Sequence, residues 1–250
     1  MSKENEDSRT ADRRHVLKLI GVAGAAVGAM PFGGAAAAAD TAIHGHANHA
    51  PVAAGSHPAS AGYEFFNTNE SAFVEAAIDT LIPHDAVGPG AVELGVATYI
   101  DRQMAGSYGK GDRLYVEGPF GEGTPQQGYQ LPMTPSELIR IGIADVNEYT
   151  RKKYKKTFDL LLAEERIAVV ADLDNRKVEL PNVPTETFFG LLLGLTTEGY
   201  FADPMYGGNA NKAAWKMIGF PGASAMYMDK IEPFRNKPYT AEPMGIQDLT

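Results

Sequence analysis

One segment of the sequence is apolar around most of its circumference when it is read as a helix. Thr185 can cap this helix, and the apolar run extends from Phe188 to Leu195. A helix that is hydrophobic on most sides must be covered by other elements, and this run is too short to span a membrane. We therefore expect a domain in which other helices pack around this segment.

Four further segments carry helix signals. They cover residues 68–82, about 92–104, 134 to about 156, and 164–173. In the third, Thr134, Pro135 and Glu137 supply a cap, a proline at the first helical position and a glutamate that reaches back. The stretches between the helices and the end of the chain are rich in Gly, Pro and Tyr, and strand signals are scarce. We predict a mostly α fold: a single helical domain over residues 63–250 with long irregular loops.

The N-terminus resembles an export signal. Arg13 and Arg14 precede an apolar run rich in Ala and Gly that ends at Ala37–Ala39. This pattern predicts a twin-arginine signal peptide over residues 1–39, with cleavage after Ala39 and an uncleaved anchor as the alternative. Residues 40–62 lack a period and are expected to form a flexible tether. The translocase that exports folded proteins would be one partner.

Composition excludes several functions. The chain has 22 basic and 31 acidic residues, a net charge of −9, and no cysteine. An acidic exported protein is a poor nucleic-acid binder, and the basic run at 151–156 is interpreted as a solvated helix face. Without cysteine, the chain cannot form disulfides, attach c-type haem covalently or hold a cysteine-ligated cluster.

The histidines do not define a metal site. His44, His46 and His49 lie in the predicted tether, where they could bind a metal ion only adventitiously. His84 follows Pro83 at a helix end. A role in the turn is expected for it, with a ligand or proton-transfer role as the alternative.

No catalytic motif is complete. Lys110 is followed by glycine rather than Ser or Thr, so the loop around it is not a phosphate-binding loop. Glu198 and Asp203 could form a glycosidase-like pair, although Asp203 before proline is also a common turn start. Tyr200, Phe201, Tyr206 and Trp215 could stack on a sugar, but a buried aromatic cluster or a protein interface is the favoured interpretation. We expect no catalytic, cofactor-binding or metal-binding residue in the chain.

The segment after residue 196 carries the most specific pattern. It reads TEGYFADPMYGGN over residues 197–209, followed by Trp215 and by IGFPG at 218–222. These motifs resemble the gluconate 2-dehydrogenase subunit 3 family. LIP at 81–83, GPGA at 88–91, YIDRQ at 99–103 and YG at 108–109 also match, so the resemblance covers about residues 66–233.

The resemblance implies a subunit of a larger dehydrogenase. In that family the small subunit accompanies a large FAD-containing subunit that oxidises a sugar or sugar acid, and usually a multihaem cytochrome c. It implies a periplasmic complex associated with the inner membrane, in which this chain supports export and assembly and the cofactors belong to its partners. The candidate motif or interface residues are Glu198, Asp203, Tyr206, Gly207, Gly208, Asn209, Trp215, Pro221 and Gly222.

Two questions stay open from the sequence. Gly207, Gly208 and Gly222 either permit unusual backbone geometry or help to grip the large subunit, and Tyr206 and Trp215 are the favoured interface residues. The alternative function is a stand-alone exported protein that binds or modifies carbohydrate through Tyr200, Tyr206, Trp215 and Glu198.

Overall fold

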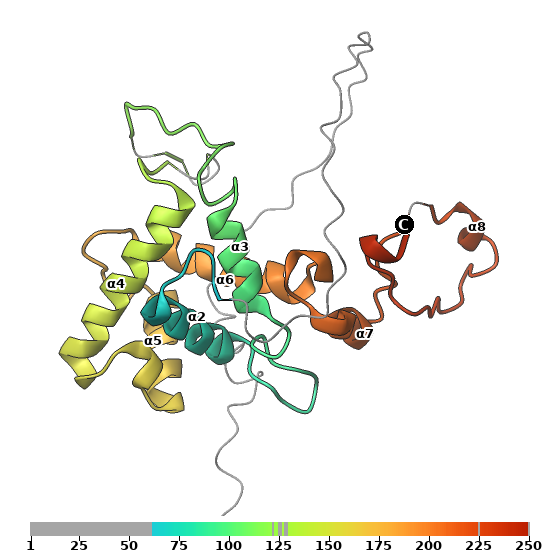
Figure 1. Cartoon of the computed structure of the whole chain (residues 1–250), viewed down its shortest axis with the longest axis horizontal. Helices are drawn as coiled ribbons and strands as arrows, with labels where there is room; N and C mark the ends of the chain where they lie inside the picture. The colour runs from blue at the N-terminus through green and yellow to red at the C-terminus, as the bar shows by residue number, and fades with distance from the viewer. Residues whose placement is uncertain (1–61, 122, 125–126, 128–129, 225, 250) are drawn as a thin grey trace, which may run out of the picture.

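The structure is a computed structural model that describes residues 62–249, apart from residues 122, 125–126, 128–129 and 225 (Figure 1). The predicted signal, with Arg13, Arg14, Ala37 and Ala39, lies outside the described residues, and so does the predicted tether except for residue 62. The descriptions that follow concern the remaining chain.

The described chain is built from helices. The longer ones are α2 (Thr68–Leu81), α3 (Val96–Ala105), α4 (Pro135–Tyr154), α5 (Ala163–Asp174) and α6 (Thr185–Phe201). The shorter ones are η2 (Phe158–Leu160), η3 (Pro204–Tyr206), η4 (Ala210–Lys212), α7 (Ala213–Ile218), α8 (Met228–Ile231) and η5 (Ile246–Leu249). Among the described residues, β pairing is limited to an isolated bridge between Gly222 and Met244. The predicted mostly α class is confirmed.

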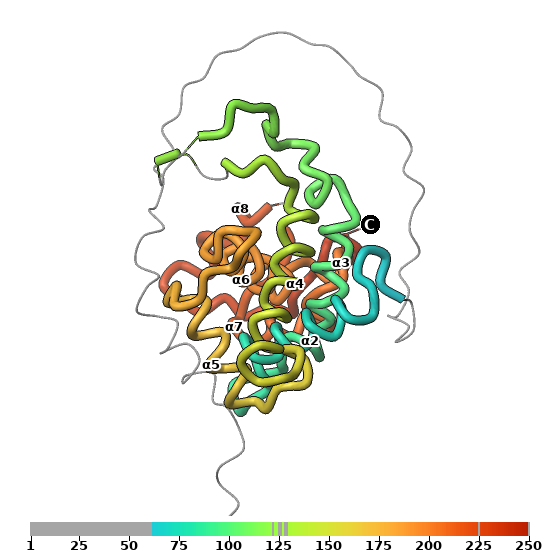
Figure 2. Tube along the Cα trace, turned by 90° about the vertical axis from the view of Figure 1, so that its left-hand side faces the viewer, coloured from blue at the N-terminus to red at the C-terminus, as the bar shows by residue number. Residues whose placement is uncertain are grey.

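Helix α6 occupies the centre of the domain. Phe188 and Leu195 on this helix are almost completely buried. It contacts α2, α3, α4, α5 and α7, which surround it (Figures 1 and 2). None of the described helices is both long and apolar enough to cross a membrane. The apolar circumference of α6 is therefore covered by the rest of its own domain.

A glycine sets the spacing between α4 and α6. A Cβ atom on Gly142 of α4 would lie 2.0 Å from the Phe188 ring, and the Phe188 side chain is fully buried. The two helices therefore approach to a distance that only glycine permits at position 142. Asp145, one turn further along α4, holds the loop before α6 because its carboxylate accepts hydrogen bonds from the backbone N–H and the side-chain amide of Asn182, at 3.0 and 2.7 Å.

The helix boundaries differ from the sequence prediction in two places. Helix α3 begins four residues later than expected, because residues 91–95 form turns that end at Gly95 with a φ of 75°. Thr185 is the first residue of α6 rather than its cap. Its hydroxyl instead donates to the Val178 carbonyl at 2.8 Å and accepts from the Leu180 N–H at 3.0 Å. The capping box at Thr134 is confirmed.

The end of the chain was expected to be irregular, and part of it is helical instead. Helix α6 continues to Phe201, and α7 follows at 213–218. Helix α7 has six residues, which is too short to show a convincing hydrophobic period. The rest of the segment is irregular, as predicted, apart from single helical turns.

A buried aspartate fixes the beginning of the described chain. The carboxylate of Asp101 on α3 accepts hydrogen bonds from the backbone N–H groups of Glu64, Phe65 and Phe66, at 2.7 to 2.9 Å. Asp101 is 2% exposed, so these amides offset the cost of burying its carboxylate. Arg140 on α4 adds a bond to the Phe65 carbonyl and lies 4.1 Å above the Phe65 ring. The chain before α2 is thereby attached to both α3 and α4.

We predict that Gly142→Ala destabilises the domain by about 1–3 kcal/mol, because the new methyl group would overpack against Phe188. Gly190→Ala on α6 is the matched control, since no atom lies within 4 Å of a Cβ there. The control should stabilise the helix by about 0.5–1 kcal/mol. Denaturant unfolding of the mature chain measures both changes, and equal unfolding free energies for the two variants would contradict the packing described here.

Candidate functional site

Gly207, Gly208 and Asn209 lie where α3, α6 and η3 come together. We call this region the motif junction; it also includes Tyr99, Tyr108, Glu198 and Tyr206. A Cβ atom on Gly208 would lie 1.9 Å from the Gly199 carbonyl oxygen of α6. Gly207 has a φ of 109°, and a Cβ on Gly95 would lie 2.8 Å from the Gly207 oxygen. The glycines therefore permit the chain after α6 to lie directly against α3 and α6.

Asn209 fixes the turn that follows these glycines. It is fully buried and has a φ of 47°, a left-handed conformation that asparagine tolerates. Its side-chain amide donates to the Ala202 carbonyl at 2.9 Å, and its side-chain oxygen accepts from the Ala214 N–H at 2.9 Å. One side chain thus ties the end of α6 to the start of α7.

Trp215 and Tyr200 bond within the chain. Trp215 is 6% exposed, and its indole N–H donates to the Phe201 carbonyl at 2.8 Å. Tyr200 is 2% exposed, and its hydroxyl donates to the Pro89 carbonyl at 2.9 Å. Both rings are therefore parts of the fold, and they expose little surface to a sugar or to a partner. The other two aromatic candidates, Phe201 and Tyr206, are 38% and 46% exposed.

The Asp203 side chain caps the N-terminus of η3. One carboxylate oxygen accepts from the Met205 N–H at 3.1 Å, and the other accepts from the Ile246 N–H at 2.7 Å. The first bond is the turn predicted before Pro204, and the second attaches the C-terminal segment to the motif. Because both oxygens bind backbone amides, Asp203 is held in a structural position rather than aimed at a substrate beside Glu198.

Pro221 and Gly222 mark the start of the C-terminal excursion. Gly222 has a φ of 85°, and a Cβ on it would lie 2.1 Å from the Met244 carbonyl oxygen. The Pro221 carbonyl accepts from the Met244 N–H at 3.1 Å. The chain at residues 221–222 approaches Met244 more closely than a side chain at residue 222 would allow.

The exposed side of the motif junction carries tyrosines around one carboxylate. Tyr99 of α3 donates to Glu198 of α6 over 3.4 Å. Burial and the Glu198 carboxylate together raise the pKa of Tyr99 to about 12, and the same two causes raise the pKa of Tyr108. Tyr206 contributes a smaller increase to the pKa of Tyr99. The junction therefore places the phenols of Tyr99 and Tyr108 near an acidic group. The sequence motifs contained Tyr99 and Tyr108, but only the fold brings them to Glu198.

His84 belongs to a separate turn. Its Nδ1 atom lies 3.0 Å from a carboxylate oxygen of Glu93, and the same oxygen accepts from the Gly90 N–H at 3.1 Å. These contacts join the two ends of the loop after α2, which agrees with the turn role expected from the sequence. Among the described residues, no group of three or more His, Cys, Asp or Glu side chains could hold a metal ion.

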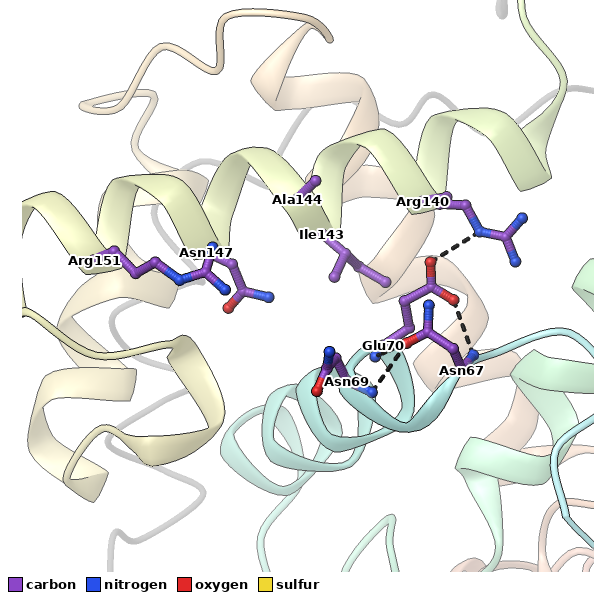
Figure 3. Close-up of a pocket in the computed structure, with 8 residues that line it drawn as sticks. All are labelled: Asn67, Asn69, Glu70, Arg140, Ile143, Ala144, Asn147 and Arg151. Atoms are coloured by element: carbon purple, nitrogen blue, oxygen red, sulfur yellow. Dashed lines mark hydrogen bonds and ion pairs between the residues drawn. The ribbon is translucent and has the colours of Figure 1, made fainter.

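A small polar pocket lies between α4 and the first turn of α2 (Figure 3). It has a volume of about 230 Å³. Its lining residues are Asn67, Asn69, Glu70, Arg140, Ile143, Ala144, Asn147 and Arg151. One oxygen of Glu70 binds Arg140 at 2.9 Å and the other caps the Asn67 N–H at 3.0 Å. The lining contains no nucleophile, and its carboxylate is used to hold α2 against α4.

Comparisons with known proteins agree with the motif. A family model described as gluconate 2-dehydrogenase subunit 3 matches residues 68–222, more than half of the chain. This range includes the motif junction and ends at Gly222. Neither a curated protein nor a solved structure matches the chain at a significant level.

We predict that Glu198→Gln lowers the pKa of Tyr99 from about 12 towards the ordinary value of 10. The decrease should be partial, because burial is the larger cause of the raised pKa. Since the folded-state pKa of Tyr99 is raised, the wild-type chain should lose stability as the pH rises from 10 through 12, and the variant should lose less. Ultraviolet titration of phenolate absorption measures this change, with Tyr99→Phe to assign the signal. Titration of Tyr99 together with exposed tyrosines in the wild type would contradict the arrangement.

Proposed function

Because the chain belongs to the gluconate 2-dehydrogenase subunit 3 family, we propose that it is the non-catalytic small subunit of a periplasmic dehydrogenase with an FAD-containing large subunit. The family match over residues 68–222 is the observation that carries this proposal. The complex is associated with the inner membrane and oxidises a CH–OH group of a sugar or sugar acid. A multihaem cytochrome c then receives the electrons.

In this proposal the redox cofactors are held by the partner chains. FAD supplies the oxidising group in the large subunit, and haem c belongs to the cytochrome. The present chain has no cysteine to attach a haem, and its sequence has no dinucleotide fingerprint. Its contribution is export and assembly: Arg13 and Arg14 engage the twin-arginine translocase while the helical domain holds the flavoprotein. Export in the folded state is useful here because FAD can be inserted in the cytoplasm before translocation.

The described residues support a scaffold role. Asp101, Asp145 and Asp203 each accept two or more hydrogen bonds from backbone or amide N–H groups. These carboxylates stabilise the fold rather than face a cleft. Tyr108 and Tyr206 of the motif junction are each 46% exposed, and aromatic residues are enriched where proteins meet.

The alternative of a stand-alone carbohydrate-binding protein finds less support. It requires Tyr200, Tyr206 and Trp215 to form one open surface, and two of these rings are buried. A protein that acted alone would also purify without a coloured partner. The absorption spectrum of the purified chain therefore separates the two functions.

We predict that Arg13→Lys/Arg14→Lys leaves both the chain and its flavoprotein partner in the cytoplasm. The substitutions keep the charge of the signal, so a loss of export would reflect the arginine pair itself. Arg9→Lys is the matched control, because it makes the same change outside the pair and should export normally. The measurement is dye-linked dehydrogenase activity in periplasmic and cytoplasmic fractions, with flavin absorption of the affinity-purified chain. Unchanged periplasmic activity in the double variant would rule out the proposed carrier role.

A further inference from the structure

Exposed large apolar side chains are concentrated near the C-terminus. The described residues include twenty of them, and nine lie between Ile218 and Leu249. Most belong to, or border, the segment 223–243, which we call the C-terminal loop. This segment, with α8, stands away from the helical body (Figure 1). The loop therefore offers apolar surface that the described chain does not cover.

The base of the C-terminal loop is closed. The Ala223 N–H donates to the Met244 carbonyl at 2.7 Å, so the two ends of the loop lie side by side. Just beyond the loop, the Ile246 N–H binds Asp203, and Asp248 forms an ion pair with Lys212. The loop thus leaves the body and returns to it at one place, next to the motif junction.

Aromatic contacts stabilise the loop from within. The ring centroids of Phe234 and Tyr239 are 4.7 Å apart, and those of Tyr227 and Tyr239 are 6.5 Å apart. The Tyr227 hydroxyl donates to the Gly222 carbonyl at 3.1 Å. Met228 and Ile231 on α8 are by contrast 75% and 60% exposed. The aromatic residues hold the loop together, and the aliphatic ones face outwards.

The exposed apolar side chains of this region are large. Met226, Met228 and Ile231 are 63%, 75% and 60% exposed. With the six other exposed side chains between residues 218 and 249, they offer on the order of 800 Å² of apolar surface in total, which is similar to the area that one partner contributes to a standard interface.

The charges of this region favour a protein over a membrane surface. Residues 223–250 carry three basic and four acidic side chains. The four acids form ion pairs with Lys212, Lys216, Lys230 and Arg235. Anionic lipids attract clusters of unpaired basic residues, and this region has no such cluster. A neutral apolar surface instead fits an apolar groove on another protein.

We propose that the C-terminal loop clasps the flavoprotein large subunit, with Met226, Met228 and Ile231 seated in an apolar groove of that subunit. This inference rests on the proposed function, and it assigns the surface through which the chain holds its partner. A carrier must keep its cargo bound during translocation, and stable protein interfaces typically bury about 800 Å² per partner. Methionine suits such a contact because its flexible side chain adapts to the opposing surface.

Met228→Asp/Ile231→Asp tests the clasp in the full chain, co-expressed with the FAD-dependent large subunit that co-purifies with the wild type. Leu160→Asp/Leu162→Asp is the matched control, because these side chains are 64% and 65% exposed on another part of the domain. Placing charges in the clasp should lower the flavin retained per tagged chain by roughly tenfold or more, because charged groups buried at an interface core are unfavourable. The control should retain wild-type flavin, and both variants should keep wild-type helicity and melting.

A photo-crosslinking residue at position 228 identifies the occupant, with the same residue at position 160 as control. A crosslink from position 228 to the flavin-containing subunit supports the clasp. Equal flavin retention in all variants, or a crosslink from position 228 to a second copy of this chain or to lipid, would overturn the clasp and leave the carrier function standing. A colourless wild-type eluate would instead reject the carrier function, and the clasp with it.

Discussion

Burial of α6 is the constraint on which the rest of the domain depends. The helix is apolar on most sides, so it is stable only when α2, α3, α4, α5 and α7 cover it. Close helix contact then requires small residues at particular points. Gly142 accommodates the Phe188 ring, and Gly208 lies directly against the Gly199 carbonyl of α6. The glycines of the motif therefore follow from the need to lay additional chain against a central helix.

The polar residues of the motif hold the chain in place beyond the end of α6. Asn209, Asp203 and the indole of Trp215 form hydrogen bonds with backbone groups at the end of α6 and in the irregular chain that follows it. Each of these hydrogen bonds fixes the course of a segment that has no regular secondary structure. The exposed tyrosines and the C-terminal loop are presented on this rigid base, which reduces the conformational entropy lost when a partner binds.

The sequence predicted the elements that have a strong local signal. The capping box at Thr134, the apolar face of α2 and the apolar circumference of α6 all depend on neighbouring residues, and the structure confirms them. The predictions failed where contacts between residues that are separated in the sequence determine the structure. Thr185 has the composition of a cap, but its hydroxyl bonds to residues 178 and 180. The Trp215 indole bonds to the Phe201 carbonyl, and Tyr99 reaches Glu198 through the packing of α3 on α6, so neither arrangement has a local signature.

The attachment at Asp101 has a consequence for protein engineering. Its carboxylate holds residues 64–66 through three backbone amides, and backbone amides are present whatever the side chains are. This anchor therefore makes no demand on sequence upstream of residue 62. We expect affinity tags or fluorescent reporters fused before residue 62 to leave the helices undisturbed, so the helical domain is suited to fusion with other proteins at this end.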